Sequence, residues 1–471
     1  MASWLHNFTP DLPCLNDEYD FVIVGSGLTA VSFVHRLTKL SRNKRILVIE
    51  AGLPRLSEHF QQETEDAAWT AFQEVADEEI GAGLPSLVPH RILFGGRTLF
   101  WTAWTPRPTI EELDRWPKKL VTTLLSEFQE AEEFLGTDRA DTTSMPGDKF
   151  PWSAVSGYSI NPASIARRNG VKFSAVSVWR EIFSSGKNII NIVCGARVSE
   201  LLAEEQQITG LKFGDVEKHF SGAQFVLCAG ALENFRLSNR LGNVTHSIAC
   251  HGVVSHVITG RLLEPTKRPT AMGAMLARPN RNEGPFDHHF QICLASLAPG
   301  WTADQVHRMS PDALELSAKI LPKTADFACT ITCLFEFPSL QQKTDDQLSG
   351  SSGFAASAES RGVDNPALFA EALSAQFTYF QDRTKDFAER FLDFEALENQ
   401  SVQTQTVAKY VVHDTLINSE VTDLEVKSWR QIHGMCGNCF TLGQINWPSI
   451  GVSNPAILNV AAAFALANEL A

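Results

Sequence analysis

The sequence predicts an α/β protein with a Rossmann-like dinucleotide-binding domain and a second α+β domain built on an antiparallel sheet. Near the N-terminus, an apolar strand, a glycine-rich turn, a helical stretch and a second apolar strand follow one another, as a βαβ unit requires. Between about residues 260 and 400, alternating apolar and polar runs are typical of antiparallel strands.

The βαβ unit carries the pattern G-x-G-x-x-A. Gly25 permits the tight turn, Gly27 lets a pyrophosphate approach the backbone, and Ala30 lets the helix pack closely on the sheet. Glu50 ends the second strand, 23 positions after Gly27, where its carboxylate can accept a hydrogen bond from a ribose hydroxyl. The unit predicts a bound adenine dinucleotide; the alternative is a glycine-rich turn in an unrelated α/β domain.

Size and charge narrow the class of protein. The chain has 471 residues, 44% of them hydrophobic, so we expect two lobes with a large core. A net charge of −14 argues against nucleic acid or an anionic membrane as a partner. The sequence has no apolar run long enough to span a bilayer and no signal peptide, so we expect a cytoplasmic protein.

The 9 cysteines are scattered and indicate reduced, mostly buried thiols. Cys436 and Cys439 form a lone C-x-x-C, whereas zinc would need a second ligand pair nearby. We therefore predict no metal site and expect the pair to be neighbouring strand residues.

The remaining elements follow from local patterns. We expect helices over 57–79, 110–134 and 385–395, strands over 188–198, 225–231, 288–294 and 327–335, and a meander between 198 and 213. The small, polar stretch 348–362 is typical of a flexible loop or lid. In the last helix, Asn454 is expected as N-cap and Pro455 at the first helical position.

Four segments in this order resemble the glucose–methanol–choline (GMC) oxidoreductases, and most closely their pyranose-oxidase-like branch. They are residues 25–30 (GSGLTA) with Glu50, residues 95–102 (GGRTLFWT), residues 228–234 (CAGALEN), and the block from Gly437 to Pro455. The resemblance covers the flavin-binding half of the chain and implies a GMC/p-hydroxybenzoate-hydroxylase-like architecture. It implies an FAD-binding domain formed by residues 1–260 and 401–471, and a substrate-binding domain at 261–400.

The resemblance also implies which residues bind FAD. These are Gly25, Gly27, Leu28, Thr29, Glu50, Ala51, Gly95, Gly96, Thr98, Trp101, Thr102, Val198, Ala229, Gly230, Gly443, Asn454 and Pro455. Some relatives attach FAD covalently through a histidine at the position that Phe100 occupies here, so we expect non-covalent FAD. Of the aromatic residues Phe94, Phe100, Trp101 and Trp104, one or two are expected to wall the flavin pocket and the others to be core.

The family's active site pairs a histidine with a second histidine or an asparagine. Asn454 matches the second member, and His413, 41 positions earlier, matches the first. A neutral imidazole can take the hydroxyl proton of an alcohol while hydride leaves its carbon for flavin N5. The sequence after His413 departs from the family pattern, and His433 is the alternative base. His288 and His289 are either an ordinary half-buried pair or include one residue that faces the substrate, since strand residues alternate faces.

The leading interpretation is an FAD-dependent alcohol oxidase or dehydrogenase that acts on a carbohydrate or a small natural product, with oxygen or another electron acceptor. The alternatives are a non-redox lyase on the same flavin scaffold, and a catalytically impaired flavin-binding protein. An NAD(P) dehydrogenase is disfavoured because it leaves the C-terminal block without a role.

Overall fold

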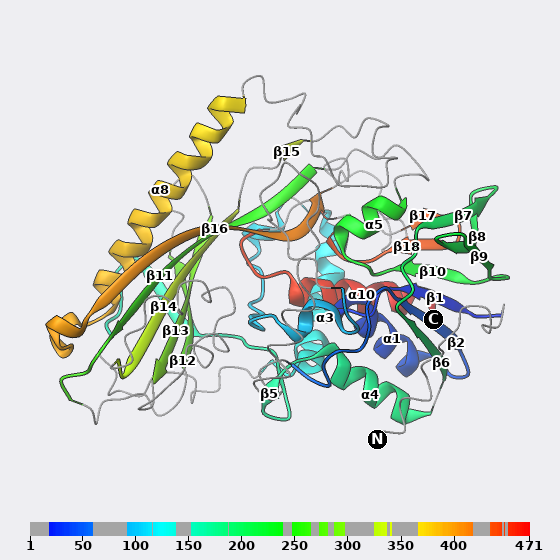
Figure 1. Ribbon diagram of the computed structural model, residues 1–471, viewed down its shortest axis with the longest axis horizontal. Coiled ribbons are helices and arrows are strands. Elements are labelled where there is room, and N and C mark those ends of the chain that lie inside the picture. The colour runs from blue at the N-terminus through cyan, green and yellow to red at the C-terminus, as the bar shows by residue number, and fades with distance from the viewer. Residues whose placement is uncertain are drawn as a thin grey trace.

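The protein was analysed as a computed structural model. It describes residues 18–59, 92–114, 116–137, 152–186, 188–238, 247–264, 273–280, 287–296, 325–336, 340–341, 366–417, 434–444, 447 and 451–471. These form two bodies, one around a parallel sheet and one around an antiparallel sheet (Figure 1). The predicted stretches 57–79 and 348–362 fall wholly or largely outside the described residues.

The first body is built on a 6-stranded sheet with the order β17-β18-β10-β1-β2-β6. Its strands are β1 (Phe21–Val24), β2 (Arg45–Glu50), β6 (Ile189–Cys194), β10 (Gln224–Leu227), β17 (Gly434–Cys436) and β18 (Cys439–Thr441). All neighbours pair in parallel except β17, which forms a hairpin with β18. The carboxyl ends of the parallel strands therefore meet at one edge of the sheet.

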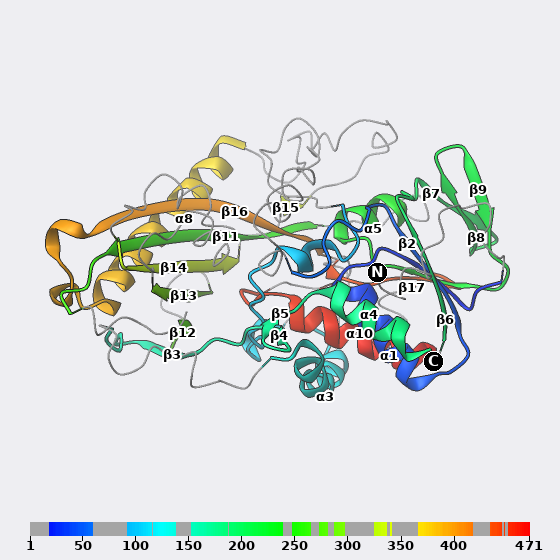
Figure 2. The ribbon, with the colours of Figure 1, turned by 60° about the horizontal axis from the view of Figure 1, so that its bottom comes forward.

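The two faces of this sheet are covered differently, and alternate strand residues separate them. Phe21, Ile23 and Val48 face helices α1 (Leu28–Leu40), α3 (Lys118–Leu135), α4 (Ala175–Ser185) and α10 (Ala456–Leu470). Val22 and Leu47 face a meander of β7 (Glu200–Glu204), β8 (Gln207–Phe213) and β9 (Val216–His219). Figure 2 shows the four helices gathered on one side and the meander beyond the other. This layering confirms the Rossmann-like prediction.

The second body is a 7-stranded antiparallel sheet ordered β15-β11-β14-β13-β12-β3, with β16 paired to β11. Its strands are β3 (Tyr158–Pro162), β11 (Ser247–Gly260), β12 (Gly273–Pro279), β13 (His288–Ser296), β14 (Phe327–Glu336), β15 (Leu340–Gln341) and β16 (Gln403–Ile417). One face packs on α8 (Pro366–Phe391), where rings of Phe290 and Phe335 stack on Phe387 and Phe380. The helix predicted at 385–395 overlaps the end of this longer element but runs past its last residue, Phe391.

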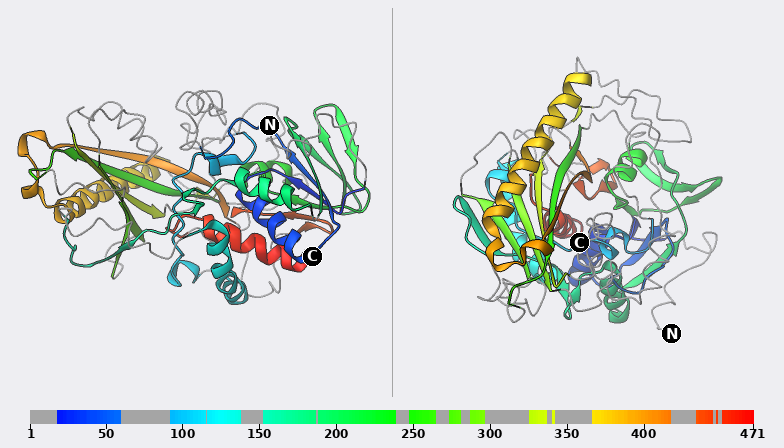
Figure 3. Two further views of the ribbon diagram at one scale, coloured as in Figure 1. Left: turned by 90° about the horizontal axis from the view of Figure 1, so that it is seen from below. Right: turned by 60° about the vertical axis from the view of Figure 1, so that its left-hand side comes forward.

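The chain crosses between the two bodies several times. As a result, three strands of the antiparallel sheet lie outside residues 261–400, the range predicted for the substrate-binding domain. These strands are β3, β11 and β16, and the long pair β11–β16 extends toward the first body (Figure 3). The domain boundaries given by the resemblance remain a prediction. Every helix in the described part of the chain is too short or too polar to cross a membrane.

Smaller elements complete the fold. They are the β4 (Arg167–Arg168) and β5 (Val171–Lys172) pair, helix α5 (Ala231–Ser238), and the 3-10 turns η4 (Gly96–Leu99), η5 (Glu111–Leu113), η11 (Phe394–Ala396) and η12 (Asn399–Ser401). The hairpin β17–β18 pairs Cys436 directly with Cys439, which confirms both as neighbouring strand residues.

Candidate active site

The predicted dinucleotide residues gather at the carboxyl edge of the parallel sheet. Gly25 follows β1, Glu50 ends β2, Ala229 follows β10 and Gly443 follows β18. The Gly25 amide donates to the carbonyl oxygen of Ile49 at 2.7 Å, which ties the first turn to β2. Gly25 has a φ of +102°, and a Cβ there would lie 2.4 Å from the Cys228 carbonyl oxygen. Only glycine fits between these strands.

Ser26 links this turn to the second predicted segment. Its hydroxyl donates to Glu50 Oε2 at 2.6 Å and accepts from the Gly95 amide at 2.9 Å. The Glu50 carboxylate also accepts the amides of Ser26 and Gly52. Burial raises the pKa of Glu50, and these hydrogen bonds oppose that rise. A carboxylate has about four lone-pair sites, and with the Ala51 amide four donors occupy them, so a ribose hydroxyl would share a site or replace one of these donors.

The residues at the start of α1 fit a diphosphate. Gly27 is the N-cap, the cap makes no side-chain hydrogen bond, and the first turn carries no acid. A Cβ at Gly27 would meet nothing within 4 Å, whereas one at Gly96 would lie 3.4 Å from the Gly27 Cα. The two glycine segments therefore approach each other beside the first amides of α1, where helix termini attract anions. Leu28 and Thr29 form the first turn of this helix.

Hydrogen bonds within the segment 95–102 and to residues 173 and 175 hold this segment in place. Thr98 Oγ1 donates to the Gly95 carbonyl oxygen and accepts from the Ala175 amide, at 2.7 and 2.9 Å. Trp101 Nε1 donates to the Phe173 carbonyl oxygen. Phe94, Phe100 and Trp104 are buried in the core shared with the helices, while Trp101 is only partly buried. Within the segment, Arg97 is exposed, and Gly96, Trp101 and Thr102 are half-buried.

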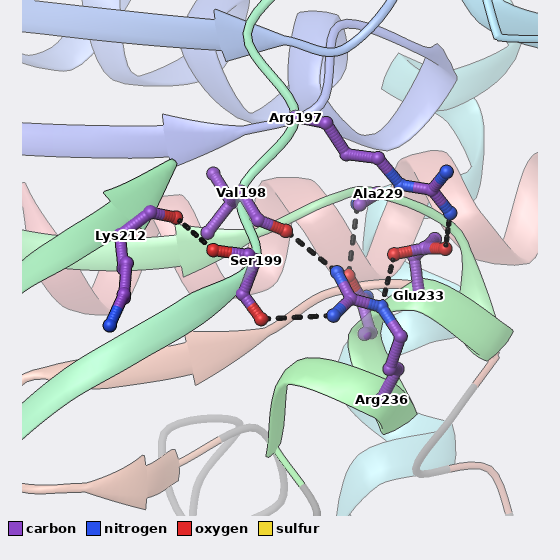
Figure 4. Close-up of polar contacts among 8 residues, drawn as sticks. Arg197, Val198, Ser199, Lys212, Ala229, Glu233 and Arg236 are labelled. Atoms are coloured by element: carbon purple, nitrogen blue, oxygen red, sulfur yellow. Dashed lines mark hydrogen bonds and ion pairs between the residues drawn. The ribbon is translucent and has the colours of Figure 1, made fainter. Parts of the chain in front are cut away.

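Another group of contacts surrounds Val198 (Figure 4). Arg236 of α5 donates to the Val198 carbonyl oxygen at 2.6 Å and to Glu233, which also binds Arg197. These contacts fix the loop after β6 against α5, which directly follows Ala229 and Gly230. Ala51, after Glu50, lies at the same edge of the sheet as this loop, because the Ala196 amide donates to the Glu50 carbonyl oxygen.

Asn234 joins the loops after β10 and β18. Its Oδ1 accepts from the Ala229 amide, and its Nδ2 donates to the carbonyl oxygens of Leu227 and Leu442. The residue is fully buried. These bonds bring Gly443 to the dinucleotide edge although the two segments are more than 200 positions apart in the sequence.

A second cluster surrounds the loop that leads into α10. Glu112 Oε2 accepts from the amides of Val452 and Ser453 at 3.0 and 2.8 Å, and Oε1 accepts from the Ser453 hydroxyl. Arg278 of β12 donates to the Ser453 hydroxyl and to the Arg107 carbonyl oxygen. A buried carboxylate and a guanidinium from opposite bodies therefore hold Val452 and Ser453, the two residues before Asn454.

The start of α10 differs from the prediction. The helix begins at Ala456 with Pro455 as N-cap, and no side chain caps it. The expectation that Asn454 caps the helix is wrong, because Asn454 Oδ1 instead accepts a hydrogen bond from Gln291 Nε2 at 2.5 Å. Asn454 is thus turned toward β13 of the antiparallel sheet.

His413 lies in an irregular part of β16. The register of β11 and β16 shifts between Ala249↔Thr415 and His251↔Val411, so Val412, His413 and Asp414 together face only Cys250. Such bulges are frequent next to active sites. The structure describes the backbone of His413 but not its side chain, and His433 lies outside the described residues.

The histidines of β13 separate as alternation requires. His288 contacts Tyr158 and Phe380 on the α8 side of the sheet. His289 is fully buried on the other side, with Nε2 at 3.2 Å from Gln291 Nε2. Burial, and to a smaller extent the charge of Arg278, hold the pKa of His289 well below its usual range. Of the two, only His289 belongs to the cluster around Asn454.

Sequence reasoning missed several residues of both clusters. Ser26 lies between the two glycines and could have been noticed there. Gln291 follows His289 by two positions and so shares its face of the strand. Glu112, His251 and Arg278 carry no local signal, because their partners are distant in the sequence. Within the described residues, the structure shows no group of three or more potential metal ligands.

Comparison with known proteins establishes the fold. No family model and no curated protein matches the sequence. Among solved structures, that of pyridoxine 4-oxidase from Mesorbium loti matches with a TM-score of 0.52 and 16% identity, over 96% of this chain and 99% of that chain. This likeness and the two sheets confirm the predicted fold, a Rossmann-like domain with a second domain built on an antiparallel sheet.

Proposed function

We propose that this chain is a GMC-type oxidoreductase that binds FAD non-covalently and oxidises a CH–OH group of a carbohydrate or small natural-product alcohol to a carbonyl. The observation that carries the proposal is the position of Asn454. It stands just before the last helix and faces the antiparallel sheet, whose β16 has a bulge at His413. The fold shared with an enzyme named as a pyridoxine oxidase supports the same class of reaction.

In this proposal the residues at the carboxyl edge of the parallel sheet hold the cofactor. The amides at the start of α1 bind the diphosphate, and Glu50 binds a ribose hydroxyl. FAD supplies the acceptor for the hydride, that is, for the two electrons that leave the alcohol carbon.

In this proposal His413 and Asn454 act on the alcohol. His413 accepts the hydroxyl proton, so the C–O bond becomes C=O as the hydride departs. Asn454 orients the alcohol oxygen by a hydrogen bond. The contacts of Glu112, Arg278 and His251 with the loop 451–453 keep Asn454 in place. A fixed donor is more effective than a mobile one because no reorganisation is needed during the reaction.

The proposal is tested by the spectrum of the purified protein and by anaerobic mixing with a panel of alcohols. The panel contains D-glucose, D-galactose, benzyl alcohol and pyridoxine. We expect a yellow protein whose flavin is bleached by at least one alcohol, and re-oxidised by oxygen or by an artificial acceptor. A colourless protein that binds NADH would refute the proposal. A flavin that stays oxidised while an alcohol is consumed would indicate a lyase.

A further inference from the structure

A buried chain of polar groups connects β13 with Asn454. His289 is fully buried and Gln291 is 7% exposed, and both lie on the same face of the strand. Gln291 Nε2 lies 2.5 Å from Asn454 Oδ1 and 3.2 Å from His289 Nε2. The amide nitrogen of Gln291 thus stands between two groups, one from its own strand and one from the other body.

The directions of these two hydrogen bonds constrain each other. An amide nitrogen has two protons and no lone pair to offer, so Gln291 donates both to Asn454 Oδ1 and to His289 Nε2. Because its pKa is held low, His289 is neutral, and a neutral imidazole with an accepting Nε2 carries its proton on Nδ1, which is buried and has no hydrogen-bond partner within the described residues. Reversing Gln291 would require His289 to change tautomer and Asn454 to turn over as well.

We propose that Gln291, itself oriented by His289, is a positioning residue that fixes the direction of the Asn454 amide, so that Nδ2 is the donor presented to the alcohol oxygen. This inference rests on the proposed function. The alcohol oxygen gains negative charge as its proton leaves, so a donor stabilises it and an acceptor destabilises it. With Oδ1 bound to Gln291, Asn454 can only present its donor side.

The tautomer of His289 tests this series of hydrogen bonds without a measurement of catalysis. Long-range proton–nitrogen NMR correlations on protein labelled with ¹⁵N in its histidine rings distinguish a protonated from an unprotonated ring nitrogen, and His289→Gln identifies the signal. We expect Nε2 unprotonated and Nδ1 protonated. A proton on Nε2 would mean that Gln291 presents its oxygen, and would overturn the inference even if alcohols reduce the flavin.

The isosteric change Gln291→Glu tests the consequence for the reaction. At a pH high enough to ionise the buried carboxyl, it only accepts hydrogen bonds, so it should attract Asn454 Nδ2 and turn the amide over. We expect anaerobic flavin reduction by the most active alcohol of the panel to slow about 10²-fold or more, with a smaller change in KM, since loss of one such donor costs about 10²–10³-fold. The double variant with Asn454→Ala should be no slower than Asn454→Ala alone.

Two controls separate positioning from packing. Gln224→Glu makes the same substitution at the start of β10, at the opposite end of the strand from Ala229, and should reduce at the wild-type rate. His289→Gln keeps an acceptor for the second proton of Gln291 and should be faster than His289→Leu, which removes it. The two His289 variants give the same test if Gln291→Glu does not fold.

Any of three results would overturn the inference. These are flavin reduction in Gln291→Glu at the wild-type rate, additive effects in the double variant with Asn454→Ala, or equal rates for His289→Gln and His289→Leu. A panel that leaves the wild-type flavin oxidised would refute the proposed function, and the NMR result would still decide the tautomer.

Discussion

His251 Nε2 donates a hydrogen bond to the carbonyl oxygen of Gly451 at 2.6 Å. This bond joins two parts of the candidate site that are 200 positions apart in the sequence. His251 stands on β11 next to the bulge that contains His413, and Gly451 begins the loop that ends at Asn454. One buried side chain therefore sets the position of the strand and of the loop relative to each other.

Burial of the His251 side chain should make the stability of the protein depend on pH. Burial lowers the pKa of His251 to about 4, below its value of about 6.5 in an unfolded chain. Between these values the unfolded chain binds more protons, so the free energy of unfolding falls as the pH drops from about 6.5 to about 4, by up to ~3 kcal/mol for this group. Thermal melts of His251→Leu should lack this part of the loss. His219→Leu, on the exposed end of β9, should keep it.

Replacing His413 by alanine should leave the flavin bound and slow its reduction by an alcohol. Loss of a general base costs about 10²–10⁴-fold in rate, while substrate affinity should change much less. Anaerobic stopped-flow measurements on His413→Ala, His433→Ala and the wild type make the comparison. If His433→Ala is the slow variant and His413→Ala reduces normally, His433 is the base.

Replacing Glu50 by alanine should weaken FAD binding by about 5- to 150-fold, because a buried group left without its partner costs roughly 1–3 kcal/mol. Flavin retained after dilution and filtration measures this loss. Glu18→Ala is the matched control, since the side chain of Glu18 is 83% exposed. Equal retention in the two variants would contradict the role given to Glu50.

Acid precipitation should release all the flavin into the supernatant. Phe100 occupies the position at which some relatives carry the attaching histidine, and a phenyl ring cannot form that bond. The absorbance of supernatant and pellet measures the outcome. Flavin that stays with the pellet would reveal a covalent link elsewhere.

Cys436 should be the most reactive of the described thiols at neutral pH. A hydrogen bond from the Cys439 thiol is the largest of the effects that lower the pKa of Cys436 to about 7, whereas burial holds the pKa of the Cys194 thiol well above its usual range. Since the thiolate is the nucleophile, alkylation by iodoacetamide should rise with pH to half its limit near pH 7. Peptide mass spectrometry identifies the site. A midpoint near the ordinary value of about 8.5 would contradict the hydrogen bond.

Local patterns were enough to predict the parts of the molecule that depend on neighbours in the chain. The turn at Gly25 and Gly27, the acid at Glu50 and the alternation in β13 follow from side chains a few positions apart, and the structure places them as the two-sheet fold requires. The resemblance indicated Asn454 on the same kind of information, since it stands just before a distinct last helix.

The tertiary structure decided how these parts meet. Asn454 was expected to cap its helix, but Gln291 from the other body takes its side-chain oxygen. Glu112, Arg278 and His251 hold the loop before it, and no local pattern marks them. Buried polar groups must find partners wherever the chain brings them together, and which partners come together depends on the packing of the two bodies. The sequence therefore predicted the two-domain fold, whereas packing determined the direction of each hydrogen bond.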